Sequence, residues 1–570
     1  MDPDEEWEAT EGVPRMEDKF IQQYLNGRDA LVAQEKQKRS DRLFREALSP
    51  TAFEACAIVD QIRFEEQQTL WTPEYEDSLS GERANAYPGM MFMLARDRME
   101  KSKLWNIVRR MPKGALLHSH LEAMVDLDWL LKQLFETEGI YIKATAPLQT
   151  PNELLKAPFI FQYCKTVSSQ NNSIWTESYP PNALISIKKA AESFSGGEEE
   201  FVNWLRSRLT ITYEESLKHH EGVNEVWRKF TSIFPIIGSL LFYEPIFRKW
   251  IRRMFEQLRQ DGVQYVELRH GFVAPFIREG ADDPDEDYSQ FFKAFGEELK
   301  AFQATEEGKN FWGARIIWSG IRRFDKKMII GAMKECIEMK KLYPDLVAGF
   351  DFVGQEDLGR PLAELVPEIF WFKKRCVEEG VDIPFFFHAG ECLGDGDSTD
   401  ENLFDAILLG TRRIGHGFSL YKHPLLIDMV KDKKILIESC PISNEVLRLS
   451  ASIMSHPLPS LLARGVPCSL SNDDPAFLGQ GSNGMTHDFW QALQGWDNLG
   501  LAGLGSLAEN SVRWAAFEDC SSKEWLHEIK MGAVGKSIRA TRLQEWLASW
   551  EDFCRWVVSE YGADEDFERE

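Results

Sequence analysis

The sequence predicts an α/β protein whose main domain is a (β/α)8 barrel, also called a TIM barrel. Two observations lead to this fold: apolar runs of strand length recur along the chain, and segments with helical patterns separate them. Eight such runs are present, and a barrel of this kind needs eight parallel strands. They are Ala115–Leu121, Val263–His270, Arg315–Arg323, Leu346–Gly354, Ile383–Glu391, Arg412–Phe418, Ile435–Asn444 and Val466–Pro475.

The run Ile383–Glu391 shows most clearly what these strands carry. Its apolar residues up to Phe387 suit a strand that is buried on both faces, as in a parallel sheet. Because side chains alternate between the faces, Phe386 and His388 share one face, and Glu391 follows where the strand becomes a loop. A buried histidine needs a polar partner. That partner can be a neighbouring carbonyl, so a functional interpretation depends on whether other strands end in the same way.

The segments around the barrel differ from it in composition. Residues 1–105 are charged and mostly helical in pattern, so we expect a helical N-terminal extension that is either a solubilising cap or a dimerisation region. The barrel domain is predicted to span 106–555. Its first two strands are too far apart for one crossover helix, which predicts an inserted subdomain at 131–225. An acidic tail is predicted at 560–570.

The composition limits the functional classes. The apolar fraction of 43% and the aromatic fraction of 12% indicate a large core, and the net charge of -25 disfavours nucleic acid or an acidic membrane surface as partner. Residues 1–20 lack the apolar segment of a secretory signal, and the longest apolar stretch, 230–243, is too short to span a bilayer. The nine cysteines form no CxxC pair, which is typical of reduced thiols. We therefore expect a cytoplasmic protein.

Several predicted strands end in histidine or aspartate, at the end of the barrel where active groups lie. Imidazole nitrogens completed by a carboxylate suit a Zn²⁺ ion with one position left for water. The predicted ligands are His118, His120, His388 and Asp473. The fourth strand offers no lysine of the kind that two-metal relatives of this architecture use. We therefore expect one Zn²⁺ per subunit, in a barrel of the metal-dependent hydrolase type.

Other residues at these strand ends suit zinc-assisted hydrolysis. His416, which ends the sixth strand, is placed to hold and deprotonate the water. Glu391 either protonates the substrate or orients a ligand histidine. Asp474 is either a substrate contact or a partner of Asp473. Of the eleven histidines, we assign only the four named above to strand ends. Surface or loop positions are predicted for His219, His220, His423, His456 and His527.

Together these motifs resemble the adenosine deaminase family. The matching segments are Met111–His120, His388–Glu391, Ile414–Gly417 and Ser471–Pro475. Two further segments, Cys440–Asn444 and Trp227–Phe234, are similar to the adenosine deaminase growth factor subfamily, which is adenosine deaminase 2-like. The long N-terminal extension is also similar to that subfamily. The resemblance covers about residues 100–490, and its motif set is highly specific.

The resemblance implies zinc-dependent hydrolytic deamination of adenosine and 2′-deoxyadenosine to inosine or 2′-deoxyinosine and ammonia. In such a reaction, zinc-bound hydroxide attacks purine C6 while Glu391 protonates N1, and His416 orients the hydroxide. The substrate contacts implied are Asp474 at N7 and Gly354 at the N3 side. The pocket residues implied are Trp227, Phe230 and Phe234. A homodimer formed through the N-terminal helices is also implied.

Three positions depart from the growth factor subfamily. Many members place an aspartate directly after the His-x-His motif, but here Leu121 follows and the acid is Glu122, as in shorter adenosine deaminases. This would bring Glu122 to the ribose 5′ end. Ile321 stands where secreted relatives have a substrate-facing histidine, and the insertion has a single cysteine, Cys164, where they have a disulfide pair. These differences favour an intracellular member and leave the sugar-side specificity open.

Three alternatives stay open. Arg322 and Arg323 would favour deamination of AMP or a modified adenine nucleotide, whereas Glu122 at the sugar would repel a phosphate by roughly a kcal/mol or more. A non-catalytic, growth-factor-like binding protein is the second alternative, and the presence of every predicted zinc ligand, Glu391 and His416 argues against it. Another hydrolase on the same scaffold is the third, and the resemblance favours deamination over it.

Overall fold

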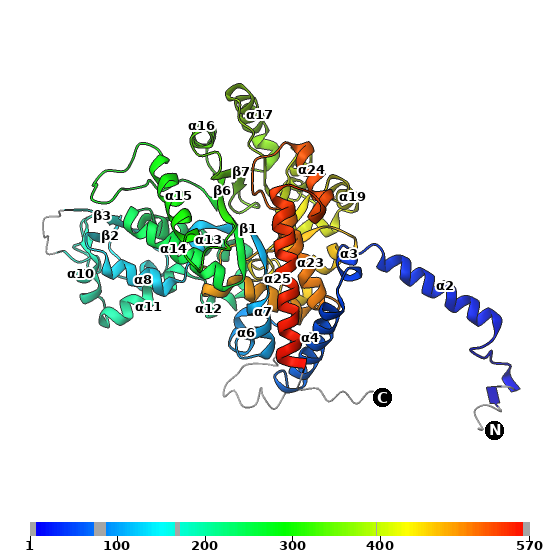
Figure 1. The fold of residues 1–570 in the computed structure, drawn as a ribbon. Coiled ribbons are helices and arrows are strands. Elements are labelled where there is room, and N and C mark those ends of the chain that lie inside the picture. Colours follow the sequence, from blue (N-terminus) through cyan, green and yellow to red (C-terminus); the bar gives the residue numbers. More distant parts are fainter. Residues whose placement is uncertain (1–6, 9, 73–86, 166–171, 395, 563–570) are drawn as a thin grey trace.

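The structure of the 570-residue chain is a computed structural model, and it describes residues 7–8, 10–72, 87–165, 172–394 and 396–562 (Figure 1). All eight predicted runs contain a strand. The barrel strands are β1 (Gly114–His120), β5 (Val263–His270), β6 (Gly313–Ile321), β7 (Val347–Val353), β8 (His388–Ala389), β9 (Arg413–His416), β10 (Leu436–Ser439) and β11 (Cys468–Leu470).

Parallel pairing joins these strands into a closed ring. The strands form two sheets, β1-β5-β6-β7 and β8-β9-β10-β11. A bridge between Phe350 and Phe385 connects the sheets on one side, and a bridge between Ser119 and Asp473 connects them on the other. The pairing therefore passes through the strands in sequence order and returns to β1. This confirms the predicted (β/α)8 barrel.

Two predicted strands are shorter in the structure. The fifth run forms only the two-residue strand β8, because Pro384 has no N–H to donate to a ladder, although its carbonyl accepts the Phe350 N–H at 2.9 Å. The seventh run is a strand only in β10 and then becomes the helix α20 (Pro441–Val446). Pro441 is the first residue of that helix, where its fixed φ is favourable.

Helices alternate with the barrel strands, and further helices follow the last strand. In chain order they are α14 (Glu244–Gln260), α15 (Ser289–Gln303), α16 (Lys326–Leu342), α17 (Leu362–Glu379), α18 (Asn402–Leu408), α19 (Pro424–Lys433), α21 (Leu458–Ala463), α22 (Gly484–Gly495), α23 (Gly500–Arg513), α24 (Ser522–Met531) and α25 (Ile538–Tyr561). The predicted acidic tail overlaps the end of α25, and its residues 563–570 lie outside the described part of the chain.

The N-terminal region is helical, as its sequence pattern predicts. Its helices are α2 (Lys19–Lys36), α3 (Arg42–Glu46), α4 (Pro50–Thr69), α6 (Phe92–Met99) and α7 (Lys103–Arg110). Helix α4 packs against α25, so a helix of the N-terminal region and the last helix of the chain lie side by side (Figure 1). Helix α2 extends away from the rest of the molecule and buries no residue. The predicted boundary at 105 falls inside α7.

The long connection after β1 folds into a small α+β unit. Its elements are α8 (Leu127–Glu136), β2 (Ile140–Ala144), α9 (Pro151–Lys156), β3 (Phe159–Tyr163), β4 (Ile185–Ser186), α10 (Ile187–Glu192), α11 (Gly197–Leu209), α12 (Tyr213–Ser216) and α13 (Gly222–Leu241). The three strands form an antiparallel sheet in the order β3-β2-β4. The predicted limits at 131 and 225 fall inside α8 and α13. Helix α13 packs on β3 and borders the barrel opening.

Charged side chains fill part of the barrel interior. Arg269 of β5 donates hydrogen bonds to Asp351 of β7 and to Glu438 of β10, each at 2.7 Å. Arg413 of β9 pairs with Glu438 and with Glu267 of β5. All five side chains are fully buried. Buried charges are tolerated when they are paired and hydrogen-bonded, so this closed network ties together strands from both sheets.

Two further observations concern the chain as a whole. Among the described residues, no helix combines the length and the apolar character that crossing a bilayer requires. Within the part of the chain that the structure describes, none of the nine cysteines forms a disulfide bond.

Candidate active site

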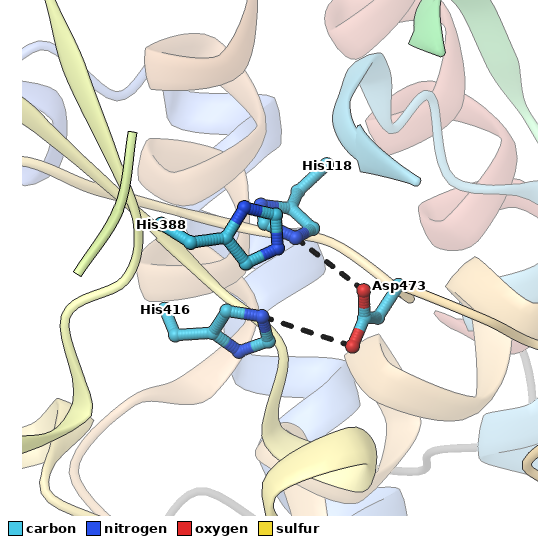
Figure 2. Close-up of side chains that lie close together, drawn as sticks. All are labelled: His118, His388, His416 and Asp473. Atoms are coloured by element: carbon cyan, nitrogen blue, oxygen red, sulfur yellow. Dashed lines mark ion pairs between the residues drawn. The ribbon is translucent and has the colours of Figure 1, made fainter. Parts of the chain in front are cut away.

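The ends of four barrel strands bring titratable side chains together. His118, His388, His416 and Asp473 each offer a ligand atom, and these atoms all lie within 4.8 Å of one another (Figure 2). His120 forms a second group with Asp473 and Asp474. All of these side chains are buried. The five residues predicted as zinc ligands or as the water-holding histidine therefore meet around one carboxylate, that of Asp473.

Asp473 lies at the centre of the cluster. Its Oδ1 is 3.3 Å from Nε2 of His118 and 3.2 Å from Nε2 of His120, and its Oδ2 accepts a hydrogen bond from the Ser443 hydroxyl at 2.7 Å. The backbone of Asp473 has φ +57°, a conformation that non-glycine residues rarely adopt. His416 is similar, with φ +62°. Such strained positions persist where the surrounding structure fixes them, and they concentrate at functional sites.

Buried carboxylates orient two of the histidines. Nδ1 of His118 lies 2.8 Å from Glu438, and Nδ1 of His388 lies 2.6 Å from Asp351. Burial lowers the pKa of His388 to about 3, which outweighs the opposite effect of Asp351, so the ring is neutral. A neutral imidazole that donates through Nδ1 has its lone pair on Nε2. The His388 ring therefore presents a bare Nε2 to the cluster, and the His118 ring is held by its carboxylate in the same way, as metal-ligating histidines are.

The hydrogen bonds around His416 place its ring proton on the other nitrogen, Nε2. The main-chain N–H of Leu458 donates to Nδ1 of His456 at 3.1 Å, and burial lowers the pKa of His456 to about 3. The proton of this neutral ring is therefore on Nε2, which donates to Oδ1 of Asn444 at 3.0 Å. The Asn444 amide then donates to Nδ1 of His416 at 3.1 Å. We infer that neutral His416 carries its proton on Nε2 and points an N–H at the cluster.

Local backbone features make this arrangement possible. A Cβ on Gly415 would lie 2.6 Å from Cε1 of His118, so only glycine lets the His118 ring sit beside β9. In β1, Leu117 belongs to an inner hydrophobic cluster while the next residue, His118, contacts Glu438. Consecutive residues can both point inward because the pairing of β1 with β5 shifts register between Leu116 and Ser119.

Glu391 is a buried acid beside the cluster. Its Oε1 lies 3.5 Å from Nε2 of His416 and has no hydrogen-bond partner. Its main-chain N–H donates to Glu356 at 2.9 Å. Burial raises the pKa of Glu391 well above its usual range, and the charges of Asp473 and Glu356 raise it further, against the opposing effect of Arg322. The surroundings of Glu391 therefore favour its protonated form.

Asp474 is a second buried acid of the site. It is fully buried, and neither of its carboxyl oxygens makes a hydrogen bond of normal geometry. Burial raises the pKa of Asp474 well above its usual range, and the neighbouring Asp473 adds to this effect. A carboxylic acid in its protonated form can donate a hydrogen bond to a bound molecule.

The cluster lies in a cavity of about 840 Å³, a size typical of small-molecule sites. The polar lining includes His120, His388, Glu391, His416, Asp473 and Asp474. The rest is mainly apolar and comes from α13, from β3 of the small sheet and from the loops after β5, β6 and β7. The cavity therefore combines titratable side chains with an apolar surface that can bind a ligand.

Comparison with known proteins identifies the family. Among solved structures, an adenine deaminase from Arthrobacter aurescens has a TM-score of 0.47 and 17% identity, covering 77% of this chain and 99% of that one. "Adenosine deaminase 2" of Homo sapiens is 33% identical over 444 residues, covering 78% of this chain and 81% of that protein. "Adenosine deaminase 2-A" of Danio rerio is 33% identical over 443 residues, covering 77% and 82%. The family model "Adenosine deaminase" matches residues 208–531. The chain belongs to the adenosine deaminase family.

As a member of the adenosine deaminase family, the chain is an enzyme of the deaminase type. The residues predicted on the substrate side all line the cavity of this deaminase: Gly354, Glu122, Trp227, Phe230 and Phe234. The three aromatic residues follow one face of α13, with ring centroids 5.2 Å apart for Trp227 and Phe230 and 5.3 Å apart for Phe230 and Phe234. Gly354 has φ +106°, which favours glycine.

The sequence analysis missed several residues of this deaminase site. It gave no role to Asp351 or Glu438, although a carboxylate inside an apolar strand is itself a signal. His456, predicted at the surface or in a loop, lies in a loop but is buried and bonded to Asn444. The statement that only four histidines end strands was wrong, because His270 is the last residue of β5. The predicted strand Val263–His270 already ended at this histidine.

Proposed function

We propose that the chain catalyses the hydrolytic deamination of adenosine and 2′-deoxyadenosine to inosine and 2′-deoxyinosine, with release of ammonia and with one Zn²⁺ per subunit. One observation carries this proposal: two buried acids, Glu391 and Asp474, and the His416 ring lie beside the histidine and aspartate cluster in one cavity. Adding water at purine C6 needs a proton donor for N1, the ring nitrogen beside that carbon. Membership in the adenosine deaminase family supports the same reaction.

The proposed zinc ligands are His118, His120, His388 and Asp473. The donor set fits this ion, because Nε2 of His118 and Oδ1 of Asp473 are buried without a hydrogen-bond partner. Three imidazole nitrogens and one carboxylate oxygen are typical Zn²⁺ ligands. Zinc held there would supply a Lewis acid that makes water acidic enough to act as a nucleophile near neutral pH. His416 is left out of this set because its Nε2 carries a proton.

The other residues act on the purine and on the attacking water. Glu391 gives its proton to N1 of the purine, which makes C6 more electrophilic. The Nε2–H of His416 donates a hydrogen bond to the oxygen of the attacking water and orients it. Asp474, as a neutral acid, donates to N7. Gly354 lies at the N3 side, where the absence of a side chain allows close approach of the ring.

The sugar side of the substrate is proposed to contact Glu122, Trp227, Phe230 and Phe234. Burial alone would raise the pKa of Glu122, but the adjacent His270 lowers it below the usual value. Glu122 is therefore ionised and accepts hydrogen bonds. The aromatic residues supply large apolar contact area with fixed geometry.

Loss of the adenine absorbance band tests this proposal. Purified, zinc-loaded protein is given adenosine, 2′-deoxyadenosine, AMP and adenine side by side. Conversion of the two nucleosides supports the proposal, and conversion of AMP in preference contradicts it. If no compound is converted while zinc is bound, the non-catalytic binding protein is the better description.

Deamination of AMP or a modified adenine nucleotide is the second candidate function. One observation favours it: Arg322 lines the cavity, and its buried Nε and Nη1 have no hydrogen-bond partner. A guanidinium with free donors can bind a phosphate. The same absorbance experiment separates the two candidates.

We also propose a homodimer formed through the N-terminal helices. Helix α2 supports this proposal because it extends from the body and exposes Phe20, Tyr24 and Leu31 (Figure 1). Apolar side chains exposed together favour an association surface. Sedimentation equilibrium of the full chain and of the triple variant Phe20→Ser, Tyr24→Ser, Leu31→Ser tests this: a dimer that becomes a monomer in the variant is expected. A monomeric full chain contradicts the proposal.

A further inference from the structure

Glu122, whose carboxylate lines the cavity, is hydrogen-bonded to a residue that does not line the cavity. Glu122 lies in the 3-10 helix η1 (Leu121–Ala123) and lines the cavity. Its Oε1 is 2.9 Å from Nδ1 of His270, the last residue of β5. The strands β1 and β5 are neighbours, with His120 opposite Arg269. The hydrogen bond therefore joins the last residue of β5 to a residue just beyond the end of the neighbouring strand β1.

His270 is enclosed by aromatic rings. Its ring centroid lies 4.7 Å from that of Phe242, 4.3 Å from that of Phe272 and 5.4 Å from that of Phe291. The side chain is 1% exposed, and Nε2 has no hydrogen-bond partner. His270 is also absent from the lining of the cavity. Within the described residues, Glu122 is the hydrogen-bond partner of this ring, so the polar effect of His270 on a ligand passes through Glu122, whereas Phe242 offers only an apolar contact with the cavity.

The enclosure around His270 is rigid. Phe272 has φ +46° and stacks on Trp318, with the ring centroids 3.8 Å apart and the ring planes at 17°. A bulky residue with positive φ is costly and persists only where packing holds it. The ring of His270 cannot move without disturbing this stack. Nδ1 therefore stays fixed, and so does the Glu122 oxygen bound to it.

The fixed hydrogen bond determines what Glu122 offers to a ligand. A carboxylate only accepts hydrogen bonds, and Oε1 is already occupied by His270. The Glu122 side chain lines the cavity and is 11% exposed, so a ligand can reach its carboxylate. It suits a hydroxyl group, which donates, and it repels a phosphate, which carries negative charge and accepts.

We propose that His270 is a positioning residue that fixes Glu122 as the acceptor for a sugar hydroxyl, which makes unphosphorylated purine nucleosides the substrate class. This inference rests on the proposed deaminase function and deepens it. Glu122 touches the substrate, whereas His270 acts only through Glu122.

Arg322 is the feature that would favour the opposite substrate class. Its Nη2 donates to the main-chain oxygen of His388, and it lowers the pKa of Glu391. The hydrogen bond holds the guanidinium beside the proposed metal ligand His388. A phosphate on the sugar would have to reach that position to use Arg322, while Glu122 would oppose it elsewhere in the same cavity.

Variants at the two positions test the proposal. His270→Phe fills the aromatic enclosure but removes the donor, and His270→Asn keeps a donor near the place of Nδ1. Glu122→Ala and the double variant Glu122→Ala with His270→Phe complete a cycle. The substrates are adenosine, its 2′-, 3′- and 5′-deoxy analogues, and AMP. Zinc content is measured for every variant, so that loss of the metal is not mistaken for loss of substrate binding.

The expected result is a specific loss of binding. His270→Phe raises KM for adenosine about tenfold or more, with kcat and zinc content nearly unchanged, and His270→Asn restores much of the loss. The analogue that lacks the contacted hydroxyl is insensitive to His270→Phe. Because His270 acts through Glu122, the double variant matches Glu122→Ala. Equal losses for adenosine and all three analogues, or AMP as the preferred substrate, overturn the proposal.

A failure of the proposed function would look different. If zinc-loaded wild-type protein converts none of the compounds, deamination is wrong. Calorimetric binding of adenosine and the deoxy analogues to the wild type and to His270→Phe then decides the role of His270. The same hydroxyl-specific loss of affinity supports it, and equal affinities for wild type and variant overturn it.

Discussion

Asp351 holds His388 at two points. Its Oδ1 accepts the main-chain N–H of His388 at 2.8 Å, and its Oδ2 accepts the ring Nδ1–H at 2.6 Å. Position and rotation of the imidazole are thus set by one side chain from the neighbouring strand β7. The same Oδ2 also accepts from Arg269 at 2.7 Å, so the carboxylate is itself fixed.

We predict that Asp351→Asn weakens metal binding although all four proposed metal-ligating residues are retained. The amide has one acceptor oxygen and cannot serve His388 and Arg269 as the carboxylate does. Loss of such a partner costs about 10- to 100-fold in metal affinity. Competition with a zinc chelator measures the change, and His388→Ala, which removes a proposed ligand, gives the scale of complete loss. If Asp351→Asn binds zinc as tightly as the wild type, the hydrogen bond between Asp351 and the His388 ring does not influence His388 as a metal ligand.

Glu391→Gln is predicted to keep zinc and lose most turnover. Glutamine has nearly the same shape but cannot give a proton to N1, and general acid catalysis contributes about 10²- to 10⁴-fold. The measurement is kcat together with zinc content, both at neutral pH. Glu364→Gln, at an exposed position on α17, is the matched control and should behave like the wild type. Near-normal turnover in Glu391→Gln would remove this residue from the mechanism.

Asn444→Asp should reverse the protonation of the His416 ring. An aspartate accepts where the amide donates, so the proton of His416 would move to Nδ1 and its Nε2 would become a bare nitrogen. We expect a loss of kcat of about 10²-fold or more, with zinc retained. Nitrogen NMR shifts of labelled histidine report the change of tautomer directly. If activity falls while the tautomer stays the same, the hydrogen-bond chain from His456 does not set the role of His416.

Glu445 is predicted to make stability depend on pH. One of its oxygens accepts the main-chain N–H of Phe92, the other has no partner, and burial raises its pKa to about 8. In the unfolded chain the pKa is about 4.3, so the folded state binds this proton more tightly and stability is lost as pH rises from about 4.3 to about 8. Glu445→Gln keeps an acceptor for Phe92 and cannot ionise. Its Tm should fall less than that of the wild type between pH 6 and pH 9, and parallel curves would contradict the prediction.

The fold was predictable because each barrel strand carries its signal locally. Apolar runs of strand length mark all eight strands, and their spacing leaves room for helices. The errors are local as well. Pro384 removes a donor from the fifth run, and Pro441 starts a helix where the seventh run was expected to continue as a strand. The positions of these two prolines in the sequence already indicated where the two strands are shortened.

The proposed metal ligands could be predicted from the sequence, but the residues that orient them could not. Histidine at the end of an apolar run is unusual enough to be noticed, as with His118 and His388. Glu438, which orients His118, stands 320 positions away along the chain, and only the closed ring brings the two together. His456 gave no signal because its hydrogen bonds, a local one from the Leu458 N–H and one to Asn444, follow no periodic pattern in the sequence.

The network around Arg269 has a consequence for how the chain folds. Its two carboxylate partners come from different sheets, Asp351 from β7 and Glu438 from β10. A half-barrel made of β1, β5, β6 and β7 alone would keep Arg269 with Asp351 but would leave Glu267 without Arg413, and the other half would keep Arg413 with Glu438 but without Arg269. Leaving such an ion unpaired costs several kcal/mol. Neither half is therefore a stable intermediate, and the ring is expected to form and to melt as a single cooperative unit.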